Sequence, residues 1–184
     1  MVVRTATVSS GFAVKEPIPA GSYSATLVKV EATEVPEQTF GGKVKAAGPG
    51  FYLTYAVKDD QMDDGGEDEF RFLRKRVRES FYDEKGKQSS LVVALRALAI
   101  SPPQNGETYD DDDWLGAGCM ATVDTYVGTD GNEHNGIAGF SLLPNVLKRT
   151  MATESARARE AFAAYDAAWE ARRAAKAAAS EPDF

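Results

Sequence analysis

Residues 70–78 combine aromatic and cationic side chains at a spacing that could bind a single strand of nucleic acid. The segment reads FRFLRKRVR, with two phenylalanines, five basic residues and no acid. In a β-strand alternate side chains share a face, so one face would carry Phe70, Phe72, Arg74, Arg76 and Arg78. Aromatic rings stack on bases and guanidinium groups contact phosphates. In the alternative interpretation the phenylalanines belong to the core and the arginines pair with the acidic segment before them.

Further candidates for this chemistry lie elsewhere in the chain. Lys43 and Lys45 sit in a glycine- and proline-rich segment, residues 35–50, which predicts a long basic loop. Tyr52, Tyr82 and Tyr126 could stack on bases, or could equally be half-buried barrel residues.

Catalytic chemistry has little support in the sequence. Cys119 and His134 are the single cysteine and histidine, which excludes a disulfide and a Cys/His zinc site within one chain. Cys119 lies in a strand pattern and His134 in a turn pattern, and neither a phosphate-binding glycine loop nor a serine elbow is present. We therefore expect a binding protein, not an enzyme, with no catalytic residue, metal or cofactor.

Two acidic runs, residues 59–69 and 110–113, do not have the spacing of a calcium-binding loop. If Asp60 took the first position of such a loop, Met62 and Arg71 would take the third and twelfth, and neither binds calcium. We expect solvated loops. The net charge of −7 also opposes indiscriminate binding to nucleic acid, so the local basic segment stands out.

The composition is that of a soluble globular protein with one core. The chain has 184 residues, 43% of them hydrophobic and 27% charged. No apolar run reaches the roughly 18 residues that a membrane-spanning helix needs, and the first residues lack the pattern of a secretory signal. We expect a protein of the host-cell cytoplasm that does not bind membranes.

The elements that position these side chains can be predicted from hydrophobic periodicity. Alternating and β-branched segments predict five strands. They are residues 23–30, 51–57, 70–78, 115–127 and 135–143. Leucines at 91, 95 and 98 predict a short helix between the third and fourth strands, capped by Ser89 or Ser90 and ended by Pro102.

This element order is typical of a five-stranded Greek-key barrel of the oligonucleotide-binding (OB) type, in which a helix between strands 3 and 4 plugs one end. A small β-sandwich with one helix is the alternative. We predict a mainly β fold with a long C-terminal α-helix added. The predicted parts are an N-terminal arm (1–17), the OB-fold barrel (18–145), the helix (150–179) and an acidic aromatic tip (180–184).

The predicted C-terminal helix is rich in alanine, arginine and glutamate. Phe162, Tyr165 and Trp169 form a stripe at three- and four-residue spacing, which could fold back on the barrel or bind a second copy of the chain. Folding back is the simpler arrangement. Arginines of this helix could add contacts with DNA, although acids interleave with them: Arg157, Arg159, Arg172 and Arg173.

Several short motifs carry a family resemblance. They are PAGSY at 19–23, the tyrosine strand at 52–57, LRALAI at 95–100, WLG at 114–116 and NGI at 135–137. With them the chain resembles bacteriophage single-stranded DNA-binding proteins of the OB fold, over roughly residues 18–143. The resemblance implies sequence-tolerant binding of single-stranded DNA.

The last four residues, EPDF, look like the acidic tip by which many single-stranded DNA-binding proteins bind replication and recombination proteins. Phe184 would enter an apolar pocket while Asp183 meets basic residues around it. The run is shorter and less acidic than is usual for such tips.

We therefore expect a protein that coats single-stranded DNA during phage replication, recombination or repair. Lys43, Lys45 and the three arginines of residues 70–78 named above would contact phosphates, and Phe70, Phe72, Tyr52 and Tyr82 would stack on bases. One alternative is a virion or assembly protein that oligomerises through its C-terminal helix. Another is an inhibitor whose acidic loops imitate DNA.

Overall fold

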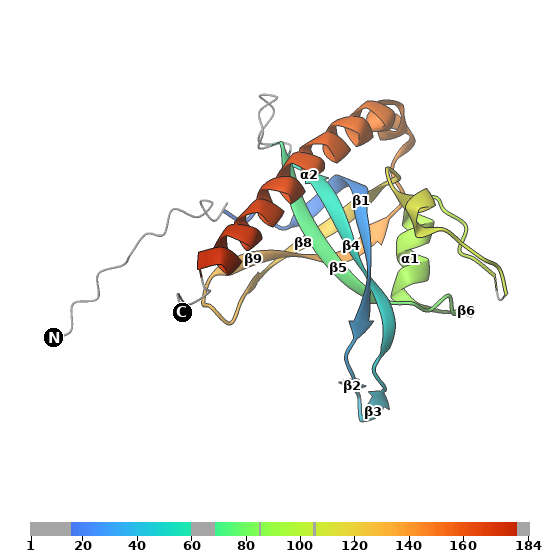
Figure 1. The fold of residues 1–184 in the computed structure, drawn as a ribbon. Helices are drawn as coiled ribbons and strands as arrows, with labels where there is room; N and C mark the ends of the chain where they lie inside the picture. Colours follow the sequence, from blue (N-terminus) through green and yellow to red (C-terminus); the bar gives the residue numbers. More distant parts are fainter. Residues whose placement is uncertain (1–15, 60–68, 85, 105, 180–184) are drawn as a thin grey trace.

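The computed structural model describes residues 16–59, 69–84, 86–104 and 106–179 (Figure 1). Most of the expected N-terminal arm therefore lies outside the described residues. So does the expected tip, with Asp183 and Phe184.

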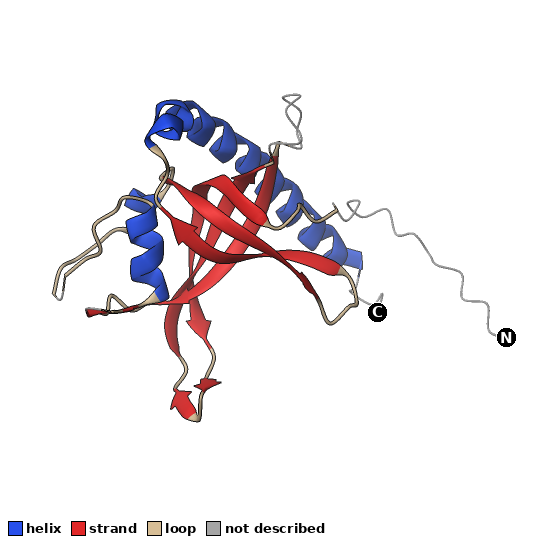
Figure 2. Ribbon diagram, turned by 180° about the vertical axis from the view of Figure 1, so that it is seen from behind, coloured by secondary structure: helices blue, strands red, loops and turns tan. Residues whose placement is uncertain are grey.

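Five long strands form one antiparallel sheet in the order β5-β4-β1-β8-β9 (Figure 2). They are β1 (Gly21–Val35), β4 (Gly48–Lys58), β5 (Phe70–Arg78), β8 (Gly118–Val127) and β9 (Glu133–Ser141). All five predicted strands are confirmed, and the bounds of β5 are those predicted. The mainly β class is confirmed with them.

The segment predicted as a long basic loop is instead a projecting hairpin. Here the prediction was wrong: β1 continues to Val35, β4 already begins at Gly48, and β2 (Gln38–Phe40) pairs with β3 (Lys43–Lys45) between them. Gly41 and Gly42 form the turn with φ values of 54° and 78°. A two-residue turn with both φ values positive favours glycine and matches the twist of paired strands.

The sheet curls until its edge strands approach each other, but it is not a closed barrel. Among the described residues no backbone ladder joins β5 to β9. A side chain bridges the seam instead, because Lys75 Nζ on β5 donates a hydrogen bond of 2.6 Å to the carbonyl oxygen of Ile137 on β9.

The main core lies on the inner side of the curled sheet, and α1 (Ser90–Ala97) covers one end of it. Ser89 caps this helix as predicted, since its Oγ accepts a hydrogen bond of 3.1 Å from the backbone N–H of Val92. Leu91 and Leu95 are fully buried. The short helix η1 (Asp111–Trp114) adds the buried ring of Trp114 to the same core. Two further short strands, β6 (Asp83–Glu84) and β7 (Lys87–Gln88), lead from β5 to α1.

The C-terminal helix α2 (Asn145–Ala179) begins five residues before its predicted start and crosses the outer side of the sheet (Figures 1 and 2). It docks through a second, smaller cluster, in which Ala158 and Phe162 pack on Val28, Ala56 and Phe70. Within the described ranges neither α-helix combines the length and the hydrophobicity that crossing a membrane requires.

On β4, Gly50 lies so close to β1 and β5 that a larger residue would not fit at this position. A Cβ on Gly50 would lie 2.4 Å from the backbone oxygen of Val77 and 2.4 Å from a methyl group of Val35. We expect Gly50→Ala to lower the free energy of unfolding by about 2 kcal/mol, measured by urea denaturation. Gly48→Ala is the matched control, because its nearest new neighbour is Arg78 Nη1 at 3.8 Å. Equal losses of unfolding free energy in Gly50→Ala and Gly48→Ala would show that the close contacts at Gly50 are not the cause.

Candidate nucleic-acid interface

The residues expected to bind nucleic acid lie on the outer side of β4 and β5. The strand register places Tyr52 opposite Arg76, Thr54 opposite Arg74 and Ala56 opposite Phe72. The other set of β5 side chains, which includes Leu73 and Val77, packs into the main core. The period of two therefore sends the aromatic and cationic set outward, as the sequence predicts.

The aromatic end of this outer face is covered by α2. Phe70 is only 5% exposed, and the ring centroid of Phe72 lies 5.2 Å from that of Phe162 and 4.8 Å from that of Tyr165. This corrects the expected role of Phe70 and Phe72 as stacking residues. While α2 is docked, neither ring is presented to a base. Phe162 belongs to the same interface. Of the aromatic stripe of α2, this residue is therefore the one that is buried against the sheet.

At the other end of the face two arginines are exposed beside a partly exposed tyrosine, and we call Tyr52, Arg74 and Arg76 the cationic patch. The guanidinium carbon of Arg74 lies 4.2 Å from the Tyr52 ring centroid, and that of Arg76 lies 6.0 Å from it. Both arginines are exposed, and Arg76 forms no ion pair with another described residue. A cation over a ring is a modest attraction that holds the groups together without using the N–H donors.

Arg78 has a structural role in place of the expected phosphate contact. Its guanidinium donates hydrogen bonds to the carbonyl oxygens of Ala46 (2.6 Å) and Pro36 (3.0 Å), and a longer one to that of Lys45 (3.4 Å). These carbonyls belong to the base of the β2–β3 hairpin, so Arg78 ties the hairpin to the end of β5. Lys43 and Lys45 are exposed on the hairpin.

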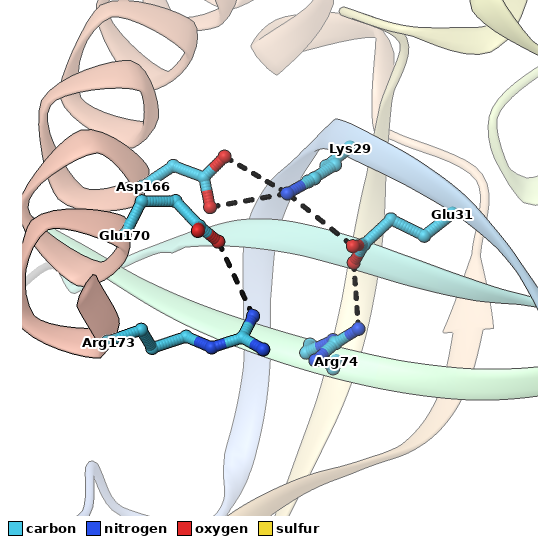
Figure 3. A network of polar contacts seen from close by, with 6 residues as sticks. All are labelled: Lys29, Glu31, Arg74, Asp166, Glu170 and Arg173. Atoms are coloured by element: carbon cyan, nitrogen blue, oxygen red, sulfur yellow. Dashed lines mark hydrogen bonds and ion pairs between the residues drawn. The ribbon is translucent and has the colours of Figure 1, made fainter. Parts of the chain in front are cut away.

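A network of charges joins the cationic patch to α2, and sequence reasoning missed it (Figure 3). Lys29 Nζ lies 3.0 Å from Asp166 Oδ2 and 3.5 Å from Glu31 Oε1, while Arg74 Nη2 lies 2.7 Å from Glu31 Oε2. Partial burial disfavours the charged ammonium, but the hydrogen bond to Asp166 and the nearby carboxylates raise the pKa of Lys29. No local pattern could reveal this network, because Lys29 and Asp166 are 137 residues apart.

The remaining tyrosine candidates lie away from β4 and β5. Tyr82 is 45% exposed and lines an open cleft of about 820 Å³ near α1, together with Phe81, Tyr109 and Arg96. Tyr126 on β8 is 55% exposed, and its ring centroid lies 5.8 Å from that of His134. The structure does not bring either tyrosine onto the cationic patch.

The single cysteine and the single histidine lie in different surroundings. Cys119 is fully buried in the core, and this burial raises the pKa of its thiol to about 12. His134 Nε2 lies 3.0 Å from Asp130 Oδ1 in the β8–β9 turn, and this hydrogen bond contributes most to holding the pKa of Asp130 below its usual range. Within the described ranges no three His, Cys, Asp or Glu side chains cluster as a metal site.

Comparison with known proteins gives no assignment for this chain. No protein-family model matches its sequence, and no curated protein matches it. A function therefore has to be derived from the outer face itself.

Proposed function

We propose that this chain is a sequence-tolerant single-stranded DNA-binding protein that acts in phage replication, recombination or repair. The observation that carries the proposal is the cationic patch. It brings together one partly exposed aromatic ring and two exposed guanidinium groups on the outer side of the sheet. Single-stranded nucleic acid requires this combination of groups, since it offers both unpaired bases and phosphates.

In this proposal the Arg74 guanidinium, which lies 4.2 Å from the Tyr52 ring centroid, turns to a phosphate, a base stacks on the Tyr52 ring in its place, and Arg76 contacts a second phosphate. A π-face is common to all bases, so stacking does not depend on base identity. The ion pair between Arg74 and Glu31 is exposed, and such pairs contribute little to stability, so a phosphate can replace Glu31 at small cost. Lys43 and Lys45 on the hairpin extend the positive surface beyond the end of β5.

The order of the strands supports the proposal. Numbered along the chain, the five long strands lie in the sheet in the order 3-2-1-4-5. Helix α1 lies between the third and the fourth of them along the chain. OB folds are partly open barrels that bind oligonucleotides on the face of strands 2 and 3, which correspond to β4 and β5 here.

A second candidate function is assembly through α2, because Tyr165 and Trp169 are 38% and 49% exposed. It requires self-association through these rings and no affinity for oligonucleotides. Docking of replication or recombination proteins by Asp183 and Phe184, and a location in the host cytoplasm, stay predictions of the sequence.

Fluorescence anisotropy tests the proposed function directly. Labelled oligothymidine, a duplex of the same length and an RNA oligomer are titrated with the protein at two salt concentrations. We expect preferential binding to the single strand over the duplex, with affinity that falls as salt rises, because phosphate contacts release counterions. Absence of binding at low salt would overturn the proposal.

A further inference from the structure

We infer that the last three turns of α2 form a second wall of the nucleic-acid site and contact the strand through Trp169, Arg173 and Lys176. This inference rests on the proposed function and extends its site from the sheet to the helix. In the proposed complex the DNA strand lies between the cationic patch on the sheet and this end of α2.

The ion pairs and ring contacts that dock α2 on the sheet lie between Glu154 and Asp166. Ser155 Oγ donates a hydrogen bond of 2.8 Å to the carbonyl oxygen of Gly116, and Phe162 is buried beside Phe72. The ion pairs of this segment are Lys58–Glu154, Arg157–Glu69 and Lys29–Asp166. Beyond Asp166 the side chains of α2 become accessible, since every residue from 169 to 178 is exposed. An exposed helical segment gains little stability from tertiary packing, so it is a candidate for contact with a ligand.

The balance of charge along the helix shifts toward the basic side in its last turns, since residues 145–166 carry four basic and three acidic side chains and residues 167–178 carry three basic and one acidic. In the docked segment two acids, Glu154 and Asp166, pair with lysines of the sheet. In residues 167–178 Glu170 is the single acid, against Arg172, Arg173 and Lys176. The helix dipole favours a cation such as Lys176 in the last turn, but it explains neither the paired arginines a turn earlier nor the half-exposed ring of Trp169.

The helical period places these side chains on the side of α2 that faces the sheet. Phe162 and Asp166 contact the strands, and positions three, four or seven residues further on share their side of the helix. Those positions include Trp169 and Arg173. In Figure 3 the Arg173 side chain extends from the helix on the same side as Asp166, in the direction of Arg74.

Arg173 on the helix and Arg74 on the sheet are thus two cationic side chains on facing elements (Figure 3). Arg173 is 69% exposed and its guanidinium lies 3.6 Å from Glu170, while Arg74 is 51% exposed on the sheet. Like charges cannot hold the end of the helix against the sheet, whereas a polyanion between them is attracted by both. Trp169 is 49% exposed and adds an aromatic ring on which a base could stack. The occupant that fits is therefore single-stranded DNA.

The test compares two α2 variants with a matched control in the full chain. Trp169→Ala removes the ring, and Arg173→Glu with Lys176→Glu reverses two charges. Lys148→Glu with Arg149→Glu makes the same change of net charge at the exposed start of α2. Binding of labelled oligothymidine is measured by anisotropy at several salt concentrations, and circular dichroism confirms that each variant is folded.

We expect Trp169→Ala to weaken binding roughly tenfold, because one stacked ring is lost. The Arg173/Lys176 double variant should weaken binding at least tenfold and reduce the slope of log K against log salt by about 1.4, which is roughly 0.7 for each cation on a single strand. The control should leave both quantities nearly unchanged. Oligothymidine should also quench tryptophan fluorescence in the wild type and not in Trp169→Phe, since Trp114 is buried.

The outcomes separate this inference from the proposed function. If the wild-type chain binds no oligothymidine, the proposed function fails and the inference fails with it. If the chain binds and the α2 variants bind as tightly as the control, only the helix wall is refuted. Tighter binding by the α2 variants would also refute it, because the helix would then obstruct the site.

Discussion

Arg74→Glu combined with Arg76→Glu is expected to weaken binding of oligothymidine by ~100-fold at low salt. Each arginine supplies a charge-assisted contact to phosphate, and each reversal adds repulsion. The slope of log K against log salt should fall by about 1.4, by the same reasoning as for α2. Both side chains are exposed, and the one ion pair that is lost, with Glu31, lies at the surface, so the fold should be retained. Anisotropy titrations at several salt concentrations measure both quantities.

The control is again Lys148→Glu with Arg149→Glu, which changes the net charge equally on another part of the surface. A drop of the same size in the control would mean that net charge, not the cationic patch, determines affinity. Unchanged affinity and slope in the Arg74/Arg76 variant would remove the assignment of β4 and β5 as the binding face.

Truncation of Phe162 is expected to have a large effect on stability. Phe162→Ala should lower the free energy of unfolding by about 3 kcal/mol, because the ring is 9% exposed and fills the contact between α2 and the outer face of the sheet. Its loss removes one of the two α2 rings that pack on Phe72 and opens the cluster that contains Phe70. Urea denaturation followed by circular dichroism measures the change.

Tyr165→Ala is the matched control for that experiment. Tyr165 also contacts Phe72, but its side chain is 38% exposed, so we expect a loss of only about 1 kcal/mol. If Phe162→Ala costs no more than Tyr165→Ala, then α2 is not held to the sheet by the Phe162 cluster. The charge pairs Lys29–Asp166 and Lys58–Glu154 would then have to dominate the docking.

Local periodicity was enough to predict the strand that carries the candidate site. The bounds of β5 were predicted as residues 70–78, and the period of two in a strand places Arg74 and Arg76 on one face, which the structure turns outward. The capping of α1 by Ser89 was predictable for the same reason, since a serine before a helical leucine pattern is a local signal.

The segment that packs on each face of the sheet could not be predicted. Alternation along a strand shows which side chains share a face, but it does not show which other part of the chain covers that face. The sequence predicts that Phe70 and Phe72 stack on DNA, whereas α2 folds back from the far end of the sequence, buries Phe70 and packs on the partly buried Phe72. Arg78 was assigned to phosphate, whereas its role depends on carbonyl groups of a hairpin that was expected to be an irregular loop.

Lys75 at the seam of the sheet has a consequence for the behaviour of the protein in concentrated solution. Edge strands with free backbone groups are templates on which strands of other molecules can add and start aggregation. Lys75 lies on the core-facing side of edge strand β5, opposite Leu53, and its ammonium group is bonded to the carbonyl of Ile137 on the other edge. A foreign strand that inserted there would have to displace this bond and cover a charge. An open sheet can therefore resist strand addition without the complete ladder that closes a barrel.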